Sequence, residues 1–345
     1  MKNPFTKILL CFGLAAGTQL TTVAQDIHFS QMFETPLLRN PALAGVFSGD
    51  VRLQSVYRTQ WNSVTTPYQT VSINGEFKMP VGNSDDFLTV GGQILYDKAG
   101  TVSLTSTHIL PALNYHKSLS DVRNTYLSFG FMGGWVQRRI DVSKMTTNNQ
   151  FDGANYNPNL GTGEALTNPT YAYWDASVGM SFLTQISENE DDNFFVGFAY
   201  HHLNRPKKLT FYSDTEVEMM PKMVASAGVR INVSESAFIT IEADHSRQGP
   251  YNQTIAGTLY TWKLGDPDNL KYLFHIGSYV RWKDAVIPVA KLEFRPLSIS
   301  ASYDANISPL KAASSGRGGF EMSLTYQKYI NNFYSSRDAV RCPKF

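Results

Sequence analysis

Apolar and polar residues alternate with a period of two along most of the chain. In 51–60, for example, Leu53 and Tyr57 would lie on one face of a strand, opposite Arg52 and Arg58. Because successive side chains of a strand point to opposite faces, this pattern predicts strands with one apolar and one polar face. It recurs in about fourteen segments, which is within the range of outer-membrane barrels: 51–60, 69–78, 87–97, 105–116, 125–138, 171–182, 193–203, 223–233, 237–246, 251–263, 271–282, 285–295, 297–304 and 319–328.

Strands of this kind build either a soluble sandwich, with its apolar faces inward, or a transmembrane barrel, with its apolar faces outward. Aromatic residues favour the barrel. They make up 13% of the chain, and Tyr, Trp or Phe recurs at the ends of one strand after another. Such positions are typical of the aromatic girdles at the two membrane interfaces.

The lengths of the connections also favour a barrel. If the first strand starts in the periplasm, the long connections 140–170, 204–221 and 305–318 lie outside the cell. The short links lie on the periplasmic side: 79–85, 118–124, 185–192, 233–236, 264–269 and 295–296. Short periplasmic turns and long external loops are typical of outer-membrane barrels. We therefore predict an all-β, antiparallel transmembrane barrel of about 14 strands over residues 50–345.

The polar faces of such a barrel surround a lumen, because a sheet in lipid must close on itself. The charged side chains on these faces either pair across the lumen or contact a passing or docked polypeptide, and the pattern leaves both open. They include Arg52, Arg58, Glu76, Arg138, Asp175, Glu242, Asp244, Arg281, Lys291, Glu293, Arg295, Asp304 and Glu321.

The start of the chain predicts export. Lys2 and Lys7, the apolar run 8–16 and a small-residue site ending at Ala24 are typical of a Sec signal peptide over residues 1–24. The run is too short for a membrane anchor. After cleavage Cys342 is the single cysteine, so no disulfide forms within the chain.

The segment 25–49 has no clean helix or strand period. It contains two turn-forming prolines, Pro36 and Pro41, and too many apolar residues for a free tail. We expect it on the periplasmic side of the first strand. There it either folds into the lumen as a partial plug or docks on a partner subunit as a strap.

Short motifs in a distinctive order run along the mature chain. They are QDIHFSQ (25–31), NPALAG (40–45), YRTQW (57–61), YDKAG (96–100), HLNRP (202–206), YVRWKDA (279–285), SYDANIS (302–308), GFEMSLTY (319–326) and RCP (341–343). Together they resemble the PorP/SprF family, and the N-terminal set is the most specific. The resemblance implies an outer-membrane component of the type IX secretion system of Bacteroidota. Such a protein helps to export or anchor proteins that bear C-terminal sorting domains, such as gliding adhesins.

The resemblance also implies partners. They are a secreted or surface cargo protein, other type IX secretion subunits on the periplasmic side, and the lipid of the outer membrane. The matched polar residues fall at the outward ends of strands, where they suggest a recognition surface. The candidate partner-binding residues are Arg58, Gln60, Trp61, Asp97, Lys98, Arg205, Arg281, Trp282, Asp284 and Asp304.

Other function classes find less support. A net charge of +1 gives no reason to expect nucleic acid. A lipid-acting barrel enzyme would need a nucleophile, and His201 and His202 have no serine elbow beside them. The stretch 265–269 lacks the spacing of a calcium loop, and the seven histidines are scattered. We expect no enzymatic activity, metal or cofactor. The alternative is a passive porin, with the 140–170 loop as its constriction.

Overall fold

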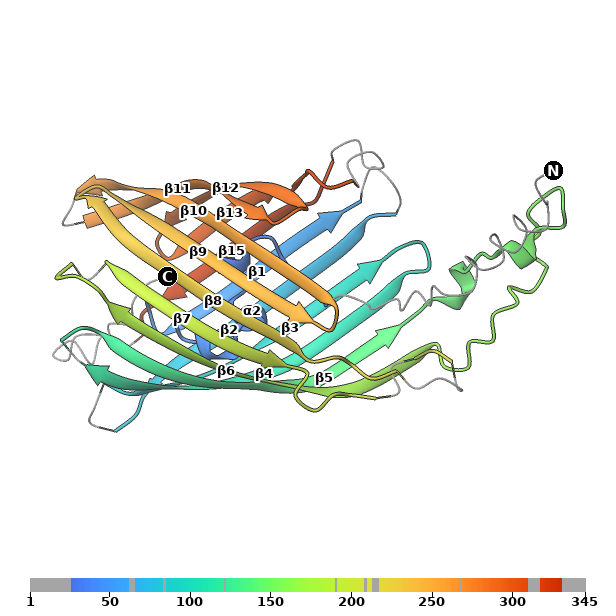
Figure 1. Cartoon of the computed structure of the whole chain (residues 1–345), viewed down its shortest axis with the longest axis horizontal. Helices are drawn as coiled ribbons and strands as arrows, with labels where there is room; N and C mark the ends of the chain where they lie inside the picture. Colours follow the sequence, from blue (N-terminus) through green and yellow to red (C-terminus); the bar gives the residue numbers. More distant parts are fainter. Residues whose placement is uncertain are drawn as a thin grey trace, which may run out of the picture.

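The computed structural model describes residues 26–61, 66–82, 85–120, 122–189, 191–207, 210–212, 217–266, 269–309 and 317–330. In these ranges fifteen strands form one antiparallel sheet that closes into a barrel (Figure 1). Fourteen build the wall, and the two-residue β14 is an extra piece paired with β12. The prediction of a 14-stranded antiparallel barrel is confirmed.

The strands follow the predicted segments closely. Each of the fourteen wall strands pairs with the wall strands before and after it, and β1 closes the barrel on β15. β7 ends two residues early, because His202 adopts a positive φ of 58° and the chain turns there. The strands are β1 (Val51–Gln60), β2 (Tyr68–Pro80), β3 (Phe87–Ala99), β4 (Leu104–Ser120), β5 (Thr125–Arg139), β6 (Thr170–Gln185), β7 (Asn193–His201), β8 (Lys222–Ser234), β9 (Ala237–Gln248), β10 (Tyr251–Asp266), β11 (Asn269–Arg281), β12 (Ala285–Phe294), β13 (Leu297–Tyr303), β14 (Ala305–Asn306) and β15 (Phe320–Lys328).

The two faces of the wall differ as the alternation predicts. On β1 the side chain of Leu53 is 54% exposed, whereas Arg52 and Arg58 are buried. Apolar side chains therefore cover the outside of the barrel, and polar ones face its lumen. No helix in the described part of the chain has the length and apolar character needed to span a membrane.

The long connections gather at one end of the barrel, which we call the outer end. They join β5 to β6, β7 to β8 and β13 to β15. The first of these, 140–169, extends well beyond the wall (Figure 1). Short connections such as 235–236 and 295–296 lie at the opposite, inner end. The prediction that the long loops share one side is thus confirmed.

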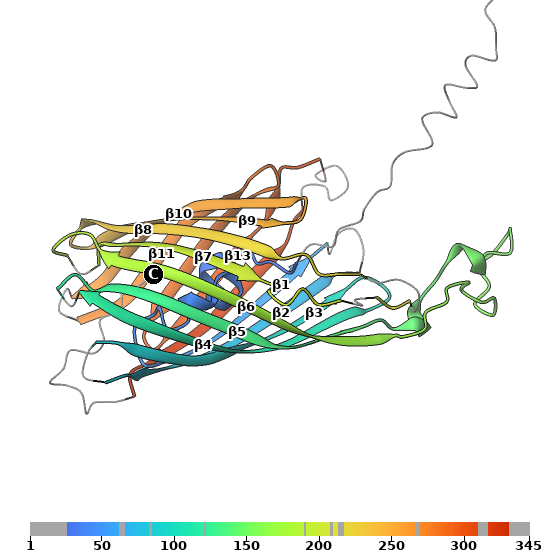
Figure 2. The same ribbon diagram turned by 60° about the horizontal axis from the view of Figure 1, so that its bottom comes forward.

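Residues 26–49, which we call the lumenal segment, lie inside the barrel (Figures 1 and 2). The segment contains three short helices, η1 (Met32–Glu34), α2 (Pro36–Arg39) and η2 (Pro41–Leu43). It lies in the lumen, which is the first of the two alternatives drawn from the sequence, although we expected it nearer the periplasmic side. It begins at the outer end, where Asp26 meets Lys222 and Gln248, and runs through the lumen to β1 at the inner end.

The apolar core lies between this segment and the wall. Leu37 and Ala44 are fully buried against Leu110 and Met132 of β4 and β5, and Met32 packs on the opposite side against Tyr279 of β11. The apolar wall residues that face the lumen are therefore buried against the N-terminal segment of the same chain. The predicted signal peptide and Cys342 lie outside the described residues.

Candidate functional site

A groove of glycines in the wall receives the turn at Asn40 and Pro41. It is formed by Gly130 on β5, Gly179 on β6 and Gly197 on β7. A Cβ on Gly130 would overlap the backbone of Pro41 and Ala42, and a Cβ on Gly179 would overlap Asn40 Oδ1. Because glycine alone lets a backbone approach this closely, these positions fit the turn and no larger residue.

The turn is also fixed by hydrogen bonds. Asn40 Oδ1 accepts a bond from Ala42 N at 2.8 Å, and Asn40 Nδ2 donates to the carbonyls of Met180 and Phe198 at 3.1 and 3.3 Å. Asn114 Nδ2 donates to the carbonyls of Ala42 and Ala44, both at 2.8 Å. The wall thus satisfies backbone groups that the short helices leave unpaired.

The middle of the segment is held by charge pairs. Arg39 binds Asp244 at 2.7 Å and Glu242 at 3.2 Å, both on β9. Glu34 binds Lys291 of β12 at 2.9 Å and accepts a bond from Gln54 of β1 at 2.6 Å. Buried charges need such partners. The segment therefore connects strands on opposite sides of the barrel.

Arg58 and Arg281, two of the predicted partner-binding residues, contact the lumenal segment. Arg58 is 1% exposed and pairs with Asp304 at 3.0 Å and with Glu321. Arg281 pairs with Asp304 at 2.9 Å. The same carboxylates accept bonds from Ser30, whose Oγ lies 2.8 Å from Asp304 and whose N lies 2.6 Å from Glu321.

This cluster shows which way two of the candidate partner-binding residues point. Arg58 and Asp304 do lie near the outward ends of strands, but they point inward at the chain's own segment. A partner could reach Arg58 only after Ser30 had moved, because the Arg58 guanidinium is bonded to Ser30 Oγ and is 1% exposed. Both interpretations of the charged lumen residues therefore hold in part, since these residues pair with one another and also hold a docked polypeptide that belongs to the same chain.

The start of the segment is held by a second set of charges at the outer end. Asp26 lies 3.2 Å from Lys222 and 3.4 Å from His202, whose other ring nitrogen lies 2.9 Å from Asp175. Burial disfavours an imidazolium, but Asp26 and Asp175 outweigh it and raise the pKa of His202 to about 9. Burial likewise opposes ionisation of Asp26, yet Lys222 and His202 hold its pKa well below 3.8.

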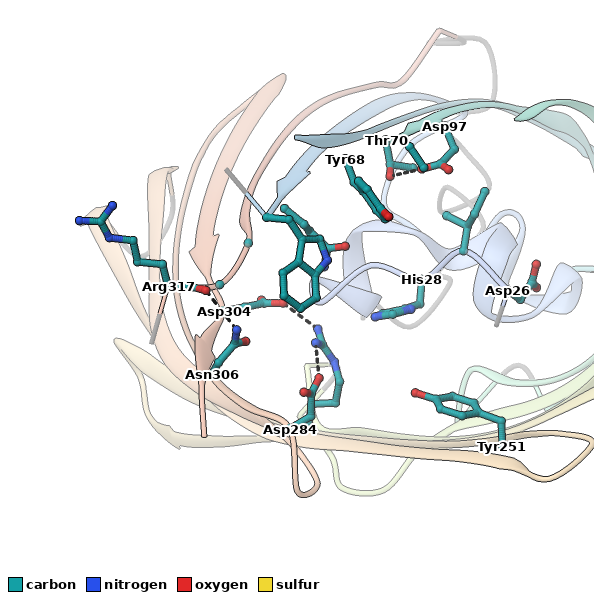
Figure 3. A pocket seen from close by; sticks show the side chains of 17 residues that line it. Asp26, His28, Tyr68, Thr70, Asp97, Tyr251, Asp284, Asp304, Asn306 and Arg317 are labelled. Carbon is teal, nitrogen blue, oxygen red and sulfur yellow. Dashed lines mark hydrogen bonds and ion pairs between the residues drawn. The ribbon is translucent and has the colours of Figure 1, made fainter. Parts of the chain in front are cut away.

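Above the Arg58 cluster lies a cavity of about 410 Å³, which we call the outer cavity (Figure 3). Its lining combines the ends of strands from both sides of the barrel with the start of the lumenal segment. Six of the ten predicted partner-binding residues line it: Gln60, Trp61, Asp97, Arg281, Asp284 and Asp304.

The remaining candidates lie elsewhere. Arg58 lies in the buried cluster, while Lys98, Arg205 and Trp282 are not part of the lining. Trp282 is 69% exposed, and Arg205 is exposed in the turn after β7. These three belong to the rim of the barrel and not to the cavity.

The sequence analysis missed several lining residues, among them His28, Tyr68, Tyr251 and Asn306. His28 and Asn306 fall inside quoted motifs, so a closer look at those motifs could have found them. Tyr68 and Tyr251 each begin a strand, and their aromatic character at a strand end was the available signal.

Within the described ranges, no three His, Cys, Asp or Glu side chains are grouped so as to hold a metal ion. The arrangement has the parts of a binding site: a cavity, fixed charges and aromatic rings. The fold and these features together define an outer-membrane barrel whose lumen is occupied by its own N-terminal segment.

Comparison with known proteins identifies the family. Residues 21–326 match the family described as "Type IX secretion system membrane protein PorP/SprF". The chain belongs to the PorP/SprF family, as its motifs suggested, and the barrel fold and the family together point to the outer membrane. No curated protein matches the chain.

Solved barrels are similar in fold. The toluene transporter TbuX of Ralstonia pickettii is 9% identical over 86% of this chain and 94% of its own, with a TM-score of 0.50. A FadL homologue of Pseudomonas aeruginosa is 10% identical over 85% of this chain and 94% of its own, with a TM-score of 0.49. The translocator domain of the autotransporter NalP from Neisseria meningitidis is 10% identical over 86% and 95%, with a TM-score of 0.42. At 9% identity the likeness to TbuX shows the fold alone.

Proposed function

We propose that this protein helps the type IX secretion system to export proteins with C-terminal sorting domains, or to anchor them at the cell surface. Gliding adhesins are one such class of cargo. The observation that carries the proposal is the family match over residues 21–326, which includes the lumenal segment and nearly all of the barrel. The proposal assigns no catalytic role to any residue.

The occupied lumen supports a protein-handling role over that of a passive porin. A porin needs a water-filled path for solutes. Here the lumenal segment is bonded to strands on several sides of the wall through Glu34, Arg39 and Asn40. The predicted constriction loop, 140–170, extends away from the barrel instead of folding into it (Figure 1).

We infer a different role for each end of the barrel. In our proposal the outer end, with its long connections and its cavity, receives the secreted protein. The inner end, with short turns, contacts other subunits of the secretion system in the periplasm. The exposed rim residues Arg205 and Trp282, together with the half-buried Lys98, are then the first contacts for cargo, because they need no rearrangement to be reached.

The proposal is tested by deleting the gene and comparing surface and culture-medium proteomes by mass spectrometry. We expect one adhesin, or a few sorting-domain proteins, to leave the surface, and exported proteins without such a domain to stay in place as the internal control. Loss of nearly every sorting-domain protein would assign a general role in secretion. If no exported protein changes its location, the proposal is wrong and a porin becomes the better account.

A further inference from the structure

The outer cavity carries more negative than positive charge. In the cluster at its base, the guanidiniums of Arg58 and Arg281 face three carboxylates, those of Asp284, Asp304 and Glu321. Asp26, at its edge, is already balanced by Lys222 and His202. One negative charge of the cluster is therefore left without a counterpart.

Asp97 adds a second negative charge. It lines the cavity from the end of β3 and accepts a bond from Thr70 Oγ1 at 2.6 Å (Figure 3). Within the described part of the chain, no ion pair joins it to a basic side chain, and the guanidinium of Arg138 on β5 acts on it only from beyond ion-pair distance. Arg317 also belongs to the lining, but its guanidinium points away from the cavity (Figure 3).

After Arg281 and Arg317, the third basic residue of the lining is His28, and it does not offset the surplus of negative charge. Burial, together with the charges of Arg281 and Arg58, lowers the pKa of His28 well below 6.5, so its imidazole is neutral. The cavity is thus a partly enclosed space with one uncompensated carboxylate in the cluster at its base and a second, Asp97, that has no ion-pair partner in direct contact. Such a space attracts a cation, since charges in it are screened less than at an open surface.

Aromatic rings complete the lining. Tyr68 from β2 and Tyr251 from β10 reach into the cavity from opposite sides (Figure 3). Trp61 lines it as well, from a backbone with φ of 63°, a left-handed conformation that bulky residues rarely adopt. A cation is attracted to the face of such rings, most strongly to tryptophan.

We propose that the outer cavity binds an ammonium or guanidinium group carried on an extended chain, with Asp97 and Asp284 as its counter-ions and Trp61, Tyr68 and Tyr251 around its stem. A volume of about 410 Å³ accommodates a long side chain with its flanking peptide groups, or a short polyamine. The two sources share this chemistry, which can be tested without any cargo protein and does not depend on the proposed function.

The test uses the full mature protein in detergent micelles and isothermal titration calorimetry. The probes are acetyl-Gly-Lys-Gly-amide and acetyl-Gly-Arg-Gly-amide, with the norleucine and glutamate peptides as uncharged and anionic controls. We expect the lysine peptide to bind roughly tenfold more tightly than the norleucine peptide, the factor given by a desolvated cation over aromatic rings. Its binding should weaken as salt rises from about 50 to 300 mM, because counter-ions screen the carboxylates.

Variants locate the site. Asp97→Asn keeps the bond to Thr70 within reach and removes one charge, so it should reduce the preference for lysine over norleucine about fivefold, and Trp61→Leu should act similarly. Neither residue holds the lumenal segment, so both variants should fold, which circular dichroism verifies. Asp152→Asn is the matched control, since Asp152 is an exposed carboxylate in the 140–169 connection that is bonded to backbone groups.

Equal affinity for the lysine, norleucine and glutamate peptides would overturn the inference, and so would an unchanged preference in Asp97→Asn. Spermidine separates the two sources. Tighter binding of spermidine than of the lysine peptide assigns the cavity to a free polyamine, and the reverse order assigns it to a protein side chain. A proteome unaffected by gene deletion would refute the proposed function and leave these affinities unchanged, so the two failures are distinguishable.

Discussion

The side-chain amide of Asn40 fills the space beside Gly179, so that a methyl group on Gly179 would overlap Asn40 Oδ1. The two residues are far apart in the sequence. Asn40 satisfies the carbonyls of Met180 and Phe198, and Gly179 leaves room for it to do so. This contact places the lumenal segment against β6 and sets its path through the barrel.

Gly179→Ala should therefore loosen the segment. Overpacking a fixed contact costs about 1–3 kcal/mol of unfolding free energy. The measurement is urea unfolding in micelles, followed by tryptophan fluorescence, together with the rate at which a protease cuts within residues 26–49. Gly75→Ala is the control, because a Cβ there meets Leu53 at an ordinary 3.5 Å. Equal stability of the two variants would show that the groove does not hold the turn.

Arg39 should be needed to keep two buried carboxylates paired. Arg39→Met leaves Glu242 and Asp244 without their cation, and breaking such a pair costs about 3–5 kcal/mol. Adding Glu242→Gln and Asp244→Asn removes the unpaired charges and should restore most of the loss. The comparison is made by urea unfolding of both variants. If the triple variant is no more stable than Arg39→Met, the charges are not the cause.

The contacts of Asp26 and His202 that hold the segment at the outer end should weaken both at high pH and at low pH. The raised pKa of His202, about 9, means that its pairs with Asp26 and Asp175 stabilise fully below 6.5 and are lost as pH rises through 9. The lowered pKa of Asp26 means that its contribution is present above 3.8 and is lost on further acidification. Stability should thus fall between about pH 6 and pH 10 in the wild type, and fall less in His202→Gln. Parallel curves for the two proteins would contradict this role of His202.

Rim residues and cluster residues should behave differently when mutated. Trp282→Ala and Arg205→Glu should release cargo from the cell surface, with unfolding free energies within about 0.5 kcal/mol of wild type, because both side chains are exposed. Arg58→Gln should destabilise the barrel, since it strips Asp304 and Glu321 of a partner. Cargo retention is read by surface proteomics. If the rim variants retain all cargo, the recognition surface lies elsewhere.

The strands were predictable because their signal is local. Alternation at Leu53 and Arg52 depends only on neighbouring residues, and the strand limits differ from expectation by a few residues at most. The path of the lumenal segment was not predictable, because its partners come from distant strands. Nothing near Ser30 in the sequence indicates Glu321, and nothing near Asn40 indicates Gly179.

The lining of the cavity was predictable in part, because the strand ends that form it have a local sequence signal. The strand ends place Trp61, Asp97 and Asp284 at one rim, which the alternation and the turns indicate. Whether Arg58 meets a partner or the chain itself depends on where Ser30 lies, and this is a matter of tertiary structure. The distinction between rim and cluster is therefore set by tertiary structure and not by the local sequence.

The central claim is that the barrel is closed by its own lumenal segment. The most direct test is ion conductance of the purified protein in planar bilayers, compared with a variant lacking residues 26–45. We predict little steady conductance for the intact protein and a clear rise for the variant, because the deletion removes the residues bonded to Glu242, Glu321 and Lys291 across the lumen. A steady, porin-like conductance of the intact protein that the deletion leaves unchanged would contradict the account.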